Sequence, residues 1–109
     1  MKLFQIYMSA SDAAQVNKGN TQLPIYKAYC DALMRGEFPG KNFYTHVADI
    51  DTTDLDQAFE IGNIGPESKI TRYAPMHSVS VGDVLVTSYG AAFIVKSIGF
   101  DAVRDWGAA

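Results

Sequence analysis

The clearest structural signal in the chain lies in residues 78–87, which read SVSVGDVLVT. The glycine–aspartate step in the middle of this stretch supplies turn chemistry, and the β-branched run after it is typical of a strand. Tyr89-Gly90 predicts a tight link to another strand over residues 91–96, which read AAFIVK. The carboxyl-terminal half is therefore expected to form a small curved sheet or a partial barrel.

Two earlier segments have the alternation of strands. Residues 2–8 carry apolar side chains without glycine or proline, and residues 43–50 read FYTHVADI. Regular alternation in the second segment predicts Val47 and Asp49 on one face and His46 on the other. The last four residues, which begin at Trp106, are expected to be a tail.

Three helices are predicted between the strands. Ser11 is expected to cap a short first helix that ends near residues 19–20. Pro24 suits the first position of a second helix over residues 24–35, and Gly36 suits its left-handed end. Asp51 or Thr52 is expected to cap a third helix with a buried stripe made of Leu55, Ala58 and Phe59.

These elements predict an α+β fold, in which two or three helices pack on one face of a small, largely antiparallel sheet or partial barrel. A length of 109 residues suits a single domain over residues 1–109. The spacing places six residues on the apolar sides of their elements, and they are expected to be buried together: Leu33, Val47, Phe59, Val84, Val86 and Phe93.

Composition narrows the class of protein. Hydrophobic residues make up 48% and charged residues 19% of the chain, an ordinary globular balance. The formal charge of -3 argues against a strongly basic nucleic-acid surface and is too small for an acidic mimic of DNA. The amino terminus lacks the long apolar core of a signal peptide, and no apolar run approaches the roughly 18 residues of a membrane span. We therefore expect a soluble cytoplasmic protein without membrane contact.

Catalytic and metal-binding patterns are weak. His46 and His77 are the only histidines, and no His-x-x-x-His or Cys-x-x-Cys spacing occurs. Cys30 is the single cysteine and falls inside a predicted helix, where nothing favours the reactive thiolate. The carboxylates between residues 49 and 60 could hold Mg²⁺, form a solvated face or meet a basic partner. The expectation is no catalytic residue and no metal.

No cofactor is expected either. Glycine-rich backbone binds phosphate when it precedes a helix, at the positive end of the helix dipole. The glycine of residues 63–66, which read NIGP, instead follows the third predicted helix, and no GxGxxG pattern occurs.

A binding surface is the use that this composition favours. Residues 62–76 are punctuated by glycine and proline and are expected to be partly a surface loop beside the acidic third helix. A methionine there offers an adaptable apolar contact, and a histidine offers a charge that changes near neutral pH. The predicted partner-binding residues are Asp54, Glu60, Asn63, Met76 and His77.

Three segments carry a resemblance to known proteins: residues 43–50, residues 55–63 and residues 75–83, with an ending at Gly99-Phe100. Their order resembles that of small uncharacterised proteins of short-tailed lytic phages and mobile elements, over about residues 43–103. The resemblance implies an accessory protein made during infection in the host cytoplasm, which binds and modulates a host or phage protein. Residues 81–84, which read VGDV, also resemble the turn and strand entry of PUA and ASCH modules.

Two functions are therefore expected as alternatives. The first is a non-enzymatic, phage-encoded protein that binds a host or phage protein. The second is a small nucleic-acid-binding module with a PUA- or ASCH-like β-barrel element, which would use Tyr44, Lys69, Arg72 and Tyr73. An enzyme with an unusual carboxylate–histidine site is the least favoured of the readings.

Overall fold

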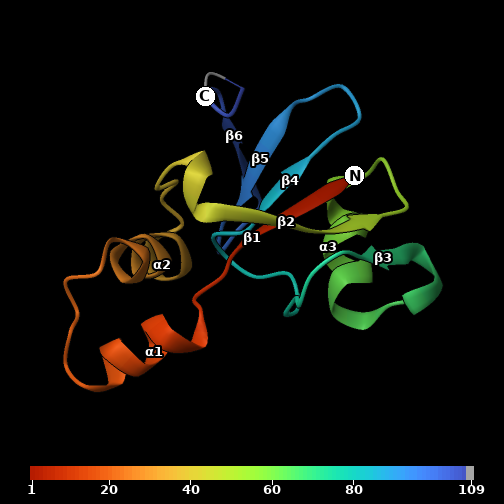
Figure 1. Cartoon of the computed structure of the whole chain (residues 1–109). Helices are drawn as coiled ribbons and strands as arrows, with labels where there is room; N and C mark the ends of the chain where they lie inside the picture. Colours follow the sequence, from red (N-terminus) through yellow and green to blue (C-terminus); the bar gives the residue numbers. More distant parts are fainter. Residues whose placement is uncertain (108–109) are drawn as a thin grey trace.

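A computed structural model, which describes residues 1–107, contains one open sheet of six strands in the order β3-β2-β1-β4-β5-β6. Every neighbouring pair in the sheet is antiparallel (Figure 1). The predicted α+β class and antiparallel sheet are thus confirmed, and the sheet does not close into a barrel. The strands are β1 (Lys2–Ile6), β2 (Tyr44–Ile50), β3 (Ile70–Arg72), β4 (Val84–Val86), β5 (Ala92–Val95) and β6 (Phe100–Val103).

The helices are α1 (Ala10–Asn17), α2 (Pro24–Arg35) and α3 (Leu55–Ile64), with short 3-10 turns at Lys41–Phe43 and Glu67–Lys69. The prediction for α2 is confirmed, including the left-handed Gly36 at φ 64°. The predicted caps of the other two helices are wrong. Ser9 caps α1 and Asp54 caps α3, because these side chains accept the backbone N–H groups of the first turn.

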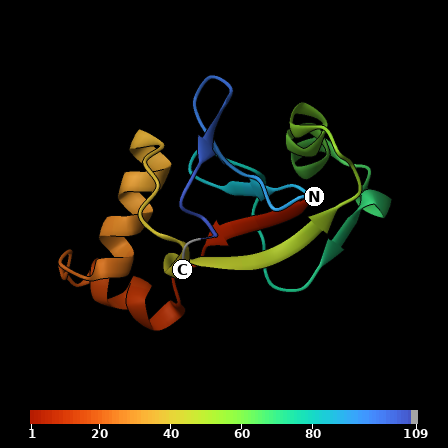
Figure 2. The same cartoon turned by 90° about the horizontal axis from the view of Figure 1, so that it is seen from above.

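The helices occupy the two ends of the sheet (Figure 2). α1 and α2 lie together beyond one end, and α3 lies at the other. α2 is held through the buried Ala28 and Ala32, and a methyl group at Gly82 would lie 2.5 Å from the backbone of Ala32. Glycine is therefore needed at this close approach. None of the helices within residues 1–107 has the length and apolar content needed to cross a bilayer.

The buried side chains form two clusters rather than the single core that we predicted. One contains Val47, Leu3, Leu85 and the α3 residues Ala58 and Ile61. The other contains Val84, Val86, Ala92, Ile94, Val103 and Trp106. Successive strand residues point to opposite faces, so a sheet that packs on both faces divides its core in two.

Three of the six predicted core residues are not buried. Leu33 is 38% exposed, Phe59 is 39% exposed and Phe93 is half-buried. The buried stripe of α3 runs through Ala58 and Ile61, so Phe59 lies at the edge of that stripe and is partly exposed to solvent. The prediction that Trp106 belongs to a tail is also wrong. Its indole is 6% exposed and lies 4.8 Å, between ring centroids, from Phe4.

A β-bulge in β2 changes which residues share a face. Leu3 of β1 pairs with Ala48 and the next residue, Phe4, pairs with His46, so Val47 is the extra residue. The regular alternation predicted for this strand is therefore wrong. The bulge turns Val47 and Ala48 into the same cluster and brings His46 to the same face as Asp49.

Candidate functional site

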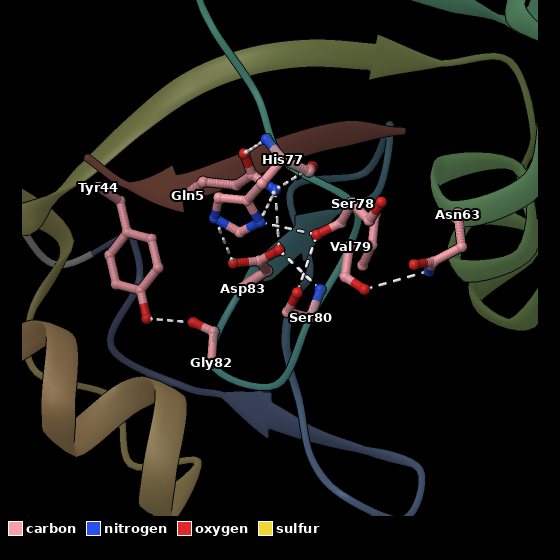
Figure 3. A network of polar contacts seen from close by, with 9 residues as sticks. All are labelled: Gln5, Tyr44, Asn63, His77, Ser78, Val79, Ser80, Gly82 and Asp83. Atoms are coloured by element: carbon pink, nitrogen blue, oxygen red, sulfur yellow. Dashed lines mark hydrogen bonds and ion pairs between the residues drawn. The ribbon is translucent and has the colours of Figure 1, made fainter. Parts of the chain in front are cut away.

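The loop between β3 and β4 is fixed to the sheet by a buried glutamine (Figure 3). Gln5 is 2% exposed, and its Nε2 donates to the carbonyl oxygen of His77 at 2.9 Å and to Oδ2 of Asp83 at 2.9 Å. Its Oε1 accepts the backbone N–H of His77 at 3.2 Å. One side chain of β1 thus determines the position of a loop more than 70 residues away in the sequence.

Asp83 is the buried charge of this network. It is 4% exposed, and its Oδ2 also accepts the backbone N–H of Ser80 at 2.9 Å. Burial raises the pKa of Asp83 to about 6, although the hydrogen bonds from Ser80 and Gln5 and the charge of His77 favour its ionised form. Nε2 of His77 lies 4.0 Å from the other carboxylate oxygen, Oδ1.

Two further side chains hold the loop from other directions. The hydroxyl of Tyr44 on β2 donates to the carbonyl oxygen of Gly82 at 2.6 Å, and burial raises the pKa of this tyrosine. Nδ2 of Asn63 on α3 donates to the carbonyl oxygen of Val79 at 3.1 Å (Figure 3). It also donates to the carbonyl oxygen of Phe59 at 2.8 Å. The loop is therefore anchored to two strands and one helix, which gives it a defined shape.

A hollow of about 190 Å³ lies where the loop meets the end of α3. Ile64, the last residue of α3, lines it and is 82% exposed. Arg72 and Glu67 line it as well and form an ion pair with each other. We call this region the α3–loop surface and define it by Asn63, Ile64, Arg72, Met76 and His77.

The structure brings together three of the five predicted partner-binding residues. Asn63, Met76 and His77 line the hollow of the α3–loop surface. Asp54 lies at the opposite end of α3, about 13 Å away along the helix axis, and caps that end through Gln57. Glu60 is exposed on α3 and does not line the hollow.

Sequence reasoning missed Ile64 and did not place Arg72 at this surface. Ile64 could have been found, because it is an apolar residue outside the buried stripe of its helix. The position of Arg72 depends on the pairing of β3 with β2, which no local pattern specifies.

A second polar cluster lies on the face of the sheet that the bulge reorganises. Nε2 of His46 lies 2.8 Å from Oδ1 of Asp49, and the hydroxyl of Tyr73 donates to Oδ2 of Asp49 at 2.7 Å. Partial burial pushes the pKa of Asp49 upward, but the hydrogen bonds from Tyr73 and His46 and the charge of His46 outweigh it and lower the pKa. Asp49 is therefore held as a carboxylate between two aromatic rings.

The other residues considered in the sequence for metal binding, thiol chemistry or nucleic-acid binding do not gather into one site. Within residues 1–107, no three side chains of histidine, cysteine, aspartate or glutamate gather closely enough to hold a metal ion. Cys30 is half-buried on α2. Two of the residues predicted to bind nucleic acid already have partners within the protein. The hydroxyl of Tyr44 donates to the carbonyl oxygen of Gly82, and Arg72 forms an ion pair with Glu67.

Comparison with known proteins gives no relative: no family model, no curated protein and no solved structure matches the chain. Its function is therefore inferred from the geometry.

Proposed function

We propose that this chain is a non-enzymatic binding protein that docks on another protein through the α3–loop surface. The observation that carries the proposal is the exposure of Ile64. Its side chain is 82% exposed, and it lines the same hollow as Met76. An exposed apolar side chain next to a concave, polar-edged surface is an arrangement in which a partner can bury a few anchoring residues.

The size of the hollow favours a protein partner over a small molecule. At about 190 Å³ it is smaller than the roughly 300–1,000 Å³ of typical ligand pockets. A volume of this order accommodates one polar side chain of a partner, because the exposed lining of the hollow is mostly polar, and the exposed Ile64 offers an apolar contact beside it. Asn63 and His77 would provide polar contacts at the rim, where water is displaced least.

The rigidity of the loop supports the same function. Gln5, Tyr44 and Asn63 hold its backbone by hydrogen bonds from three different elements. A surface fixed before binding loses little conformational entropy when the partner arrives. The polar network around Asp83 therefore serves binding by preorganising the residues that a partner would meet.

The resemblance to phage proteins suggests the setting. Under this proposal the chain is a phage-encoded accessory protein of the host cytoplasm, and it modulates a host or phage protein by occupying part of its surface. Binding in this account involves neither a cofactor nor a membrane.

The test compares two substitutions of matched character. Ile64 and Met34 are exposed to similar degrees, 82% and 79%, and both are apolar helix residues. Ile64→Glu is expected to abolish capture of the partner from host lysate, whereas Met34→Glu on α2 is expected to preserve it. Thermal melting of each variant checks the fold. Capture that survives Ile64→Glu but fails with Met34→Glu would move the binding surface to α2.

A further inference from the structure

A second, larger hollow belongs to a different face from the α3–loop surface. It measures about 560 Å³, which lies within the range of small-ligand sites. The two hollows share no lining residue. Thr71 lines the large hollow, while its neighbours Ile70 and Arg72 line the small one, because successive residues of β3 point to opposite faces.

One row of side chains across four strands forms the floor of the large hollow. The register pairs Thr71 of β3 with Asp49 of β2, Asp49 with Lys2 of β1, and Lys2 with Val86 of β4. All four residues line the hollow. Lys2 and Thr71 are exposed, whereas Val86 is buried and belongs to the cluster around Trp106, so the hollow begins where that cluster ends.

The rim comes from two segments that flank the amino-terminal end of β1 (Figure 1). Asp51, Ser68 and Lys69 contribute from the side of β2 and β3. Thr87, Ser88 and Gly90 contribute from the link between β4 and β5. With Thr71 on the floor, the hollow therefore has four hydroxyl side chains.

The charges that remain available in this hollow are mainly positive. Among the described residues, neither Lys2 nor Lys69 forms an ion pair. Both oxygens of Asp49 are occupied by His46 and Tyr73, so its negative charge is already compensated in part. Of the two carboxylates that line the hollow, Asp49 and Asp51, only Asp51 has no ion-pair partner among the described residues.

An exposed aromatic ring, that of Tyr73, contacts Asp49 on the floor of the hollow without lining the hollow itself. The hydroxyl of Tyr73 is bonded to Asp49, which lines the hollow, and the residue is 58% exposed. The ring centroid of Tyr73 lies 5.1 Å from that of His46, and His46 stacks on Phe4 at 5.0 Å. The ring is thus fixed at its hydroxyl end and presents a surface on which a planar group can stack.

We propose that this larger hollow binds a nucleotide, either free or as part of a single strand. Lys2 and Lys69 would bind the phosphate, and the hydroxyl groups around them would add hydrogen bonds. The carboxylate of Asp51 would accept hydrogen bonds from the hydroxyls of the ribose. Tyr73 would stack on the base, a contact that is nearly independent of base identity. Residues outside the protein-docking surface thus form a second site on the opposite face of the sheet.

The binding test uses three probes and three substitutions. A ten-nucleotide oligouridylate, uridine monophosphate and inorganic phosphate are titrated into the parent protein and into Tyr73→Ala, Lys69→Gln and Lys41→Gln. Lys41 is the matched control, because it lies 5.2 Å from the ring of Trp106, away from the hollow. Tyr73→Ala is expected to weaken binding of both nucleotide probes by about tenfold. Lys69→Gln is expected to reduce the slope of log K against log salt for the oligonucleotide by about 0.7.

The outcomes separate the sources of the nucleotide. Tighter binding of the oligonucleotide indicates a single strand as the ligand, and equal binding of both nucleotide probes indicates a free nucleotide. Absence of binding by both would overturn the proposal, as would phosphate binding as tightly as the nucleotides. Equal effects of Tyr73→Ala, Lys69→Gln and Lys41→Gln would also overturn it. Ile64→Glu is expected to leave nucleotide binding unchanged, so failure here is distinct from failure of the protein-docking proposal.

Discussion

The buried carboxyl group of Asp83 makes the stability of the fold depend on pH. Burial raises its pKa from 3.8 to about 6. Because the unfolded chain regains the ordinary pKa, the folded state binds the proton of Asp83 more tightly between these two values. The stability that this group contributes is therefore complete below pH 3.8 and is lost as the pH rises through about 6.

The magnitude follows from the difference in pKa. A difference of about 2 between 3.8 and about 6 corresponds to about 3 kcal/mol at 25 °C. Asp83→Asn removes the titration but keeps an oxygen that can accept from the backbone of Ser80 and from Gln5. We therefore expect the free energy of unfolding of the variant, minus that of the parent, to increase by about 3 kcal/mol as the pH rises from about 4 to about 7.

Urea denaturation at several pH values between about 4 and 7.5 measures this difference. Asp101→Asn serves as the control for loss of one carboxylate, because the side chain of Asp101 is 69% exposed. A difference between variant and parent that changes by less than about 0.5 kcal/mol over this range would refute the reasoning, since Asp83 would then ionise alike in both states.

Further predictions concern the packing of the fold and its thiol. Trp106→Ala is expected to lower the free energy of unfolding by about 3–5 kcal/mol, as for other buried aromatic residues, and urea denaturation measures it; a change below about 1 kcal/mol would return this residue to a tail. Gly82→Ala is expected to cost at least about 2 kcal/mol, because its φ is +92° and the methyl group would meet Ala32 at 2.5 Å; an unchanged melting temperature would contradict that contact. Cys30, half-buried within α2, is expected to react slowly with a thiol reagent at neutral pH and rapidly after denaturation; rapid labelling of the native protein would reopen a nucleophilic role.

Local sequence patterns predict the parts of this fold that depend on local physics. The range of α2 follows from Pro24, the spacing of apolar residues and Gly36, all of which act within the helix or next to it. The existence of β1, β2, β4 and β5 follows from runs of apolar and β-branched residues, whereas no strand was predicted at the position of β6. The proximity of Asn63 to Met76 and His77 was predicted because the segment after the third helix was expected to be partly a surface loop beside it, although their role in binding stays a prediction.

The remaining features depend on contacts between distant segments. The bulge at Val47 arises only when β2 pairs with β1, and without it His46 and Asp49 would point to opposite faces. The contact between Gln5 and Asp83 joins residues 78 positions apart. A single sequence carries no signal for such pairs, so neither the polar network nor the cluster around Asp49 could be predicted.

Site-directed photo-crosslinking tests the central claim of protein docking most directly. A photoreactive phenylalanine analogue is placed at position 64 in one variant and at position 34 in another, in protein expressed inside the host cell, so that each probe replaces an exposed helix side chain. We predict one specific crosslinked product from position 64, lost when His77→Ala is added, and none from position 34. A product from position 34 alone, or no product from position 64 in protein that melts like the parent, would contradict docking through the α3–loop surface.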